Sequence, residues 1–150
     1  MFETFSSVDL EFVASLFFVL VTGFLLGYER GSRGEPAGVR THTLVCLGAM
    51  LFTMMSRYTG TDPSRIASNV VVGIGFLGAG LIMKHGEHVR GVTSAANLWL
   101  VAAIGVVIGF GFYTIAVLSA ISAFIILKMP HIGEKRVAKI IYLQNKKNKK

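Results

Sequence analysis

The stretch LEFVASLFFVLVTGFLLGY, residues 10–28, decides the fold of this chain, because it carries a single charge in 19 residues. A helix needs about 20 apolar residues, and at least about 17, to cross the hydrocarbon core of a bilayer. Four more apolar stretches of similar length follow, at 41–56, 66–83, 92–108 and 112–127. Hydrophobic residues make up 53% of the chain and charged residues 15%, which argues against a water-soluble domain. The sequence therefore predicts an all-α, polytopic integral membrane protein with five transmembrane helices.

The basic residues fall on alternate sides of these stretches. With five membrane crossings, 13 Lys and Arg residues lie on the side of the C-terminus and two on the other side. Cytoplasmic segments carry this excess in membrane proteins, so the N-terminus is predicted outside and the C-terminus in the cytoplasm. The N-terminal segment lacks a basic region and a small-residue cleavage pattern, so we expect the first helix to be retained.

The tail, residues 129–150, differs in composition from the rest of the chain. It supplies most of the net charge of +7 and ends in a run of lysines. A short basic amphipathic helix followed by a polybasic end is typical of a segment that lies on the inner leaflet. We therefore divide the chain into a transmembrane domain at 1–128 and a basic cytoplasmic tail at 129–150, with anionic lipids rather than nucleic acid as the partner of the tail.

Small residues recur at helical spacing and predict where the helices pack. Lipid provides no hydrophobic drive for helix association, so close backbone contact must supply it. Gly23 and Gly27 form one GxxxG pair, and Gly105 and Gly109 form another. The other small faces consist of Ala95, Ala102, Ala116, Ala120 and Ala123. These faces are predicted to be buried between helices or between subunits, and a homo-oligomer is expected.

The third apolar stretch contains GIGFLGAG at residues 73–80. It matches the spacing G-x-G-x-x-G, but a dinucleotide site needs a soluble strand before it and an amphipathic helix after it. The four glycines instead favour tight helix crossing, with backbone carbonyls along a pathway as the alternative if the helix is broken. The same two interpretations, a pathway or helix packing, apply to a wider set of residues: Asn69, Gly73, Gly75, Gly78, Gly80, Thr93 and Asn97.

The first cytoplasmic loop, read as residues 28–42, concentrates charge next to the membrane. A polar cytoplasmic pocket is predicted there from six residues: Glu29, Arg30, Arg33, Arg40, Thr41 and His42. An interfacial ion-pair network is the simpler interpretation of the same residues. Because basic residues outnumber the acids, a phosphate or an anionic headgroup suits the local charge better than Mg²⁺.

Evidence for a metal centre or for catalysis is weak. His85, Glu87 and His88 have marginal metal-ligand spacing, and no further Cys or His cluster completes a site. No nucleophile, base and orienting group fall together on one side of the membrane, so an enzyme is not expected. We expect no resident cofactor, with Mg²⁺ as a possible ligand or substrate, and leave the metal ligands unassigned.

Five blocks in order resemble the MgtC/SapB family of bacterial inner-membrane proteins. They are GYER at 27–30, PAGVRTH at 36–42, RIA at 65–67, GIGFLGAG at 73–80 and GVTSAA at 91–96. The resemblance implies a multi-pass domain in the bacterial cytoplasmic membrane, linked to growth at low magnesium and, in virulence-associated members, to survival in macrophages and inhibition of the ATP synthase. Only a short tail follows the last helix, so the chain is closer to the short SapB-type members, which lack a C-terminal ACT-like domain.

Two functional hypotheses follow. In the first, the chain is a regulatory or partner-binding membrane protein in magnesium, ion or membrane-energy homeostasis, with another membrane protein such as the ATP synthase as its partner. In the second, it is a transporter or channel for Mg²⁺ or another ion, with Glu29, Asn69 and the glycine run on the pathway.

Overall fold

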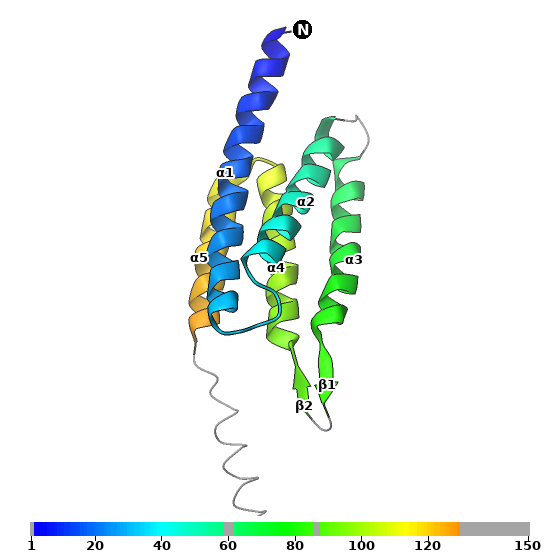
Figure 1. Ribbon diagram of the computed structural model, residues 1–150. Coiled ribbons are helices and arrows are strands. Elements are labelled where there is room, and N and C mark those ends of the chain that lie inside the picture. The colour runs from blue at the N-terminus through cyan, green and yellow to red at the C-terminus, as the bar shows by residue number, and fades with distance from the viewer. Residues whose placement is uncertain (1, 59–61, 86–87, 130–150) are drawn as a thin grey trace, which may run out of the picture.

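The structure is a bundle of five helices with one short β-hairpin (Figure 1). It is a computed structural model that describes residues 2–58, 62–85 and 88–129, so the predicted role of the 129–150 tail lies almost wholly outside the described residues. The elements are α1 Phe2–Ser32, α2 Val39–Tyr58, α3 Pro63–Leu81, β1 Met83–His85, β2 His88–Arg90, α4 Val92–Gly109 and α5 Tyr113–Lys128. The predicted all-α class is confirmed.

Three helices are long and apolar enough to cross a membrane, at Val8–Ser32, Val39–Tyr58 and Val92–Gly109. The apolar parts of α3 and α5, Ala67–Leu81 and Tyr113–Lys128, are shorter. The α1–α2 turn, the hairpin and the end of α5 lie at one end of the bundle, and the N-terminus lies at the other (Figure 1). This arrangement is the one that five alternating crossings require, while the predicted orientation in the membrane stays a prediction.

The first loop is shorter than the sequence indicated. Glu29 and Arg30 belong to α1, which continues to Ser32, and α2 begins at Val39, so the connection is only residues 33–38. Gly34 ends α1 with φ of 71°, a left-handed conformation, and its N–H donates to the Gly31 carbonyl at 3.0 Å. The chain then turns back along the bundle, and α2 begins above the lower ends of α1, α4 and α5 (Figure 1).

Both predicted GxxxG pairs pack against one helix, α2. A Cβ on Gly23 would lie 2.5 Å from the Thr43 Cα, and one on Gly27 would lie 2.5 Å from the Val39 Cα. On the other side of α2, a Cβ on Gly105 would lie 2.4 Å from the Cys46 carbonyl oxygen. The predicted small faces are buried too: Ala95, Ala102, Ala116, Ala120, Ala123, Gly105 and Gly109. The packing prediction is confirmed for these faces, and α2 packs between α1 and α4.

The glycine run of α3 behaves differently, because α3 lies at the edge of the bundle (Figure 1). Gly78 faces Ala95 on α4, whereas a Cβ on Gly73, Gly75 or Gly80 would meet nothing within 4 Å. Of the four glycines, only Gly78 contacts another helix of this chain, and close approach of a second chain to the other three stays a prediction. The alternative of a broken helix is not observed either, since α3 is continuous over Pro63–Leu81.

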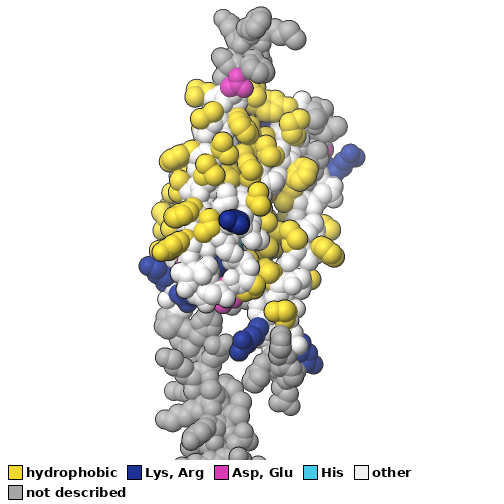
Figure 2. Space-filling model, in the orientation of Figure 1, with side chains coloured by type: hydrophobic (Ala, Val, Ile, Leu, Met, Phe, Trp, Pro, Cys, Tyr) yellow, Lys and Arg dark blue, Asp and Glu magenta, His cyan; other side chains and the backbone are white. Residues whose placement is uncertain are grey.

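The surface is that of a membrane protein. Large apolar side chains on the helices are exposed, including Phe17, Phe76 and Ile125, while Ser15, Thr53 and Ser94 are fully buried. Figure 2 shows the hydrophobic side chains over most of the bundle and most of the basic ones towards its lower end. A water-soluble protein places these groups the other way round, so the exposed apolar surface is suited to contact with lipid.

Candidate functional site

Arg30 is the centre of a polar cluster at the lower end of the bundle. Its side chain is 2% exposed, and one guanidinium nitrogen, Nη2, donates to the Ser94 hydroxyl at 2.7 Å and lies 3.1 Å from a Glu35 carboxylate oxygen. The Ser94 hydroxyl in turn donates to the other Glu35 oxygen at 2.8 Å. Three side chains from three parts of the chain thus form a closed triangle in which a buried cation has its counter-ion.

Local structure explains how these three side chains meet. Arg30 is near the end of α1, and the left-handed turn at Gly34 brings Glu35 back towards it, with the Glu35 N–H donating to the Arg30 carbonyl at 3.2 Å. Ser94 lies in the first turn of α4, which begins directly after Gly91. Gly91 has φ of 86°, and a Cβ there would lie 1.9 Å from the Leu81 carbonyl oxygen, so this connection requires glycine.

A second part of the cluster joins α2 to α4 through His42, which is fully buried. Its Nε2 lies 2.8 Å from the Asn97 side-chain nitrogen, and its Nδ1 lies 2.9 Å from the Gly38 carbonyl oxygen. An amide nitrogen only donates, so Nε2 accepts and the proton resides on Nδ1, which donates to Gly38. The neutral imidazole therefore fixes the start of α2 against α4, and Asn97 makes the cross-helix hydrogen bond that packing predicts.

Glu29 is the least satisfied member of the cluster. It is 6% exposed, and Oε1 lies 2.5 Å from Nε of Arg33, which is four residues further on and directly follows the end of α1. This ion pair lacks hydrogen-bond geometry, and neither carboxylate oxygen accepts a hydrogen bond within the described part of the chain. Arg33 is 40% exposed, so it compensates the buried charge from the surface. The carboxylate retains acceptor capacity that the cluster does not use.

The structure separates the other predicted site residues from this cluster. Arg40 is exposed on the α1 side of α2, and Thr41 is half-buried. Asn69, Gly73, Gly75, Gly80 and Thr93 are exposed. Glu35 and Ser94 were not among the predicted site residues, although they complete the Arg30 triangle. They are 59 residues apart in sequence, and only the turn at Gly34 and the start of α4 could have indicated their contact.

A smaller polar cluster lies at the opposite end and was also not predicted. Arg57, in the last turn of α2, forms an ion pair with Glu11 of α1 and donates to the Gly109 carbonyl of α4 at 3.0 Å. The Tyr58 hydroxyl donates to the other Glu11 oxygen at 2.9 Å. Arg57 thereby joins three helices and satisfies a carbonyl at the end of α4.

The described residues contain no group of three or more His, Cys, Asp or Glu side chains that could hold a metal ion. His85 and His88 pair across the β-hairpin, and Glu87 lies outside the described residues. The Arg30 and His42 clusters offer hydrogen bonds and paired charges.

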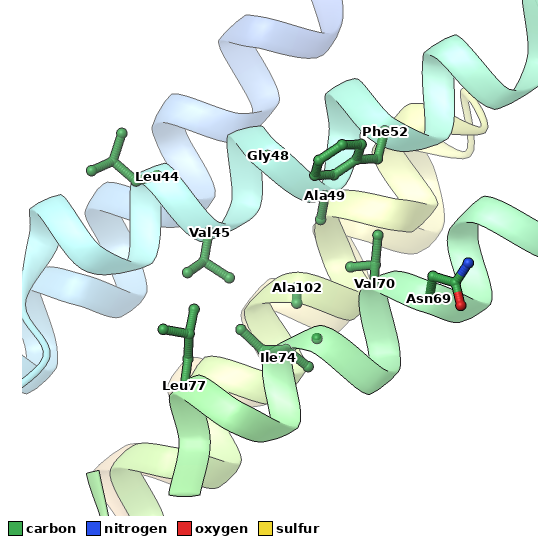
Figure 3. A pocket seen from close by; sticks show the side chains of 11 residues that line it. Leu44, Val45, Gly48, Ala49, Phe52, Asn69, Val70, Ile74, Leu77 and Ala102 are labelled. Atoms are coloured by element: carbon green, nitrogen blue, oxygen red, sulfur yellow. The ribbon is translucent and has the colours of Figure 1, made fainter. Parts of the chain in front are cut away.

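An apolar groove opens sideways between α2 and α3, with a volume of about 520 Å³ (Figure 3). We call it the α2–α3 groove. Its lining residues are Leu44, Val45, Gly48, Ala49, Phe52, Asn69, Val70, Gly73, Ile74, Leu77 and Ala102. Gly48 and Gly73 leave room on facing helices, and Asn69 contributes an exposed amide at one end (Figure 3).

These features define a helical membrane protein with a buried polar cluster at one end and an open apolar groove on its side. The MgtC family model matches residues 16–135, and the chain belongs to the MgtC family. This confirms the resemblance that the five sequence blocks indicated. No solved structure matches the chain.

Three relatives show the extent of the similarity. The chain is 39% identical to "Putative magnesium transporter YhiD" of Escherichia coli (strain K12), over 81% of this chain and 61% of the relative. It is 42% identical to "Protein MgtC" of Salmonella typhimurium (strain LT2), over 87% of this chain and 55% of the relative. It is 46% identical to "Protein MgtC" of Brucella abortus (strain 2308), over 66% of this chain and 42% of the relative. The alignments thus span about half of each relative's length.

Proposed function

We propose that this chain is a regulatory membrane protein of magnesium homeostasis that holds a transmembrane helix of a partner protein in the α2–α3 groove. The family membership and the magnesium transporter name of one relative support the link to magnesium. The observation that carries the binding role is the groove itself, where exposed Gly73, half-buried Gly48 and the exposed Asn69 amide interrupt a surface of large apolar side chains.

Each of these residues suits helix docking better than contact with lipid. A Cβ added to Gly48 or Gly73 would meet nothing within 4 Å, so a partner backbone can approach both. The Asn69 amide has no hydrogen-bonding partner in lipid tails, whereas a neighbouring helix can offer a carbonyl or a hydroxyl group. A helix seated in the groove would satisfy the amide and cover the glycines together.

The buried polar cluster differs from the groove, because its side chains bond to one another. Arg30, Glu35 and Ser94 bond to one another, and so do His42 and Asn97. Such closed networks fix helices in position, which gives a docking surface a rigid base. The partner we propose is another membrane protein, with the ATP synthase as the first candidate, in the bacterial inner membrane.

The test compares Gly73→Leu with Gly75→Leu in a host that needs this protein for growth at limiting Mg²⁺. Both glycines have open space around them on the same helix, but only Gly73 lines the groove. Leucine at 73 should fill the groove and abolish growth without lowering the amount of protein in the membrane, while leucine at 75 should leave growth unchanged. Normal growth of the Gly73→Leu strain would contradict the proposal.

Transport of Mg²⁺ is the second candidate function, and Glu29 favours it. A buried carboxylate with unused acceptor capacity inside a membrane domain is a candidate cation ligand. The test is Mg²⁺ flux into liposomes that contain the purified protein, with Glu29→Gln as the control. Saturable flux that Glu29→Gln removes would establish transport; its absence from correctly folded protein would leave the partner-binding role.

Association of the chain with itself is the simplest form of helix docking. We propose a homo-oligomer in which α3 of one copy contributes to the interface, since its open glycines suit close approach. Cross-linking in native membranes followed by denaturing electrophoresis would test this. Dimers that Gly73→Leu weakens and Gly75→Leu does not are expected, and only monomers at every cross-linker concentration would contradict it.

A further inference from the structure

A second groove lies on another side of α2, between α1 and the start of α2, with a volume of about 860 Å³. We call it the α1–α2 groove. Its lining residues are Phe17, Leu20, Val21, Phe24, Leu25, Val39, Arg40, Thr43 and Leu44. Eight of these nine are uncharged and most are large and apolar, so Arg40 is the one charge in the lining. From Phe17 to Leu25 the α1 wall is about 12 Å long at 1.5 Å per residue.

Arg40 differs from the arginines of the polar clusters in having no counter-ion. Arg30 pairs with Glu35, Arg33 with Glu29, and Arg57 with Glu11. Arg40 is exposed, and no carboxylate lies within ion-pair distance of it among the residues that the structure describes. The sequence predicted that the basic residues of the first loop bind an anion. Arg30 and Arg33 already have carboxylate partners, so Arg40 is the basic residue of that loop whose charge is still available.

The position of Arg40 adds to this charge. It is the second residue of α2, whose first turn contains no acidic residue. The first N–H groups of a helix have no partner within the helix and form the positive end of its dipole. Within the groove lining, Arg40 lies among apolar side chains of α1 and α2. Figure 2 shows basic colour partway up the bundle, apart from the basic side chains at the lower end.

We propose that the α1–α2 groove binds an anionic phospholipid, with an acyl chain along α1 and the headgroup phosphate on the Arg40 guanidinium. A guanidinium matches phosphate oxygens in a bidentate manner, and the apolar wall beside it matches hydrocarbon. Two simpler ligands each leave half of the site unmatched: a free phosphate leaves the apolar wall uncovered, and an apolar helix leaves Arg40 without a counter-ion.

The test is titration of the purified, full-length protein with phosphatidylglycerol in detergent, with bound lipid counted by native mass spectrometry. The variants are Arg40→Gln and, as the matched control, Arg90→Gln, which removes an exposed charge from β2 at the same end of the bundle. Arg40→Gln should weaken binding about fivefold, the effect of one basic residue near an anionic lipid surface. Arg90→Gln should bind as the unmodified protein does.

Further variants test the apolar wall of the groove and guard against misfolding of Arg40→Gln. Val21→Trp, which fills the groove, should also weaken phosphatidylglycerol binding, and excess inorganic phosphate should not displace the lipid. If Arg40→Gln fails to give a native circular dichroism spectrum, Arg40→Lys replaces it and should bind with intermediate affinity. Equal binding by unmodified protein and the Arg40 variant, equal weakening by Arg90→Gln, displacement by phosphate alone, or a second copy in place of lipid would each overturn the proposal.

Discussion

Helices α2 and α3 both carry small residues in apolar sequence, yet they occupy opposite situations in the bundle. α2 receives the glycines of α1 on one side and those of α4 on the other, at distances that admit no Cβ. α3 presents three of its own glycines to open space. Small residues therefore mark close approach in both places, but on α2 the approaching helix belongs to the same chain, and on α3 we propose that it belongs to another.

The largest difference is expected from alanine at matched glycines. Gly105→Ala places a Cβ against the Cys46 carbonyl and the Ala49 side chain, so the helices must move apart. We expect a loss of stability of about 1–3 kcal/mol, the usual range for overpacking. Gly75→Ala meets nothing and should stabilise α3 by up to about 1 kcal/mol through helix propensity.

Thermal unfolding of the purified protein, followed by circular dichroism, measures both changes. Gly23→Ala offers a second test on the α1 side of α2, where a Cβ would lie 2.5 Å from the Thr43 backbone. If Gly105→Ala and Gly75→Ala shift the transition equally, the contrast between the two helices is wrong.

The side-chain amides of Asn97 and Asn69 are expected to differ by a smaller change in stability. Asn97→Leu removes the donor to His42 and leaves a buried ring nitrogen without its partner, which should cost about 0.6–1.7 kcal/mol. Asn69→Leu replaces an exposed amide and should leave stability unchanged while impairing growth at limiting Mg²⁺. Denaturant titration measures stability for both variants. A stability loss from Asn69→Leu as large as that from Asn97→Leu would show that α3 is packed more tightly than described.

The smallest effect concerns where each helix begins. α2 begins inside the bundle, but α3 begins at exposed Asp62, which accepts from the Ser64 N–H at 2.9 Å and from its hydroxyl at 2.7 Å. These hydrogen bonds hold the pKa of Asp62 below its ordinary value of 3.8. The stabilisation is thus present above pH 3.8 and is lost as the pH falls through the lowered folded-state pKa.

Asp62→Ala should therefore increase amide hydrogen exchange in the first turn of α3 at neutral pH, and have little effect once the pH is below the folded-state pKa. Exchange in α2 should not respond at either pH. Unchanged exchange at the start of α3 at neutral pH would remove Asp62 as its cap.

The sequence predicted much of this structure because membrane helices follow simple rules. Residues 10–28 and 92–108 lie inside α1 and α4, and the pairs Gly23–Gly27 and Gly105–Gly109 pack as expected. A small-residue face must approach another backbone to gain contact in lipid, so periodicity alone identifies it.

Which neighbour a face meets could not be predicted. Gly73 and Gly105 look alike in sequence, but only the fold shows that α3 lies at the edge and that α4 packs closely against α2. In the same way, Arg30 and Arg40 are similar charges beside the membrane. The left-handed turn at Gly34 places Glu35 beside Arg30, and Ser94 also bonds to Arg30. Among the described residues, Arg40 has no such partners. This difference depends on the conformation of one glycine and on a contact with a distant residue, so the sequence alone could not predict it.

The central claim, that α2–α3 forms a docking groove, is tested most directly by photo-cross-linking in native membranes. A photoreactive amino acid is placed at Leu77, which lines the groove, or at Phe76, its exposed neighbour outside the lining. We predict a discrete protein adduct from position 77 that Gly73→Leu removes, and none from position 76. Adducts from both positions alike, or none from position 77, would contradict the claim.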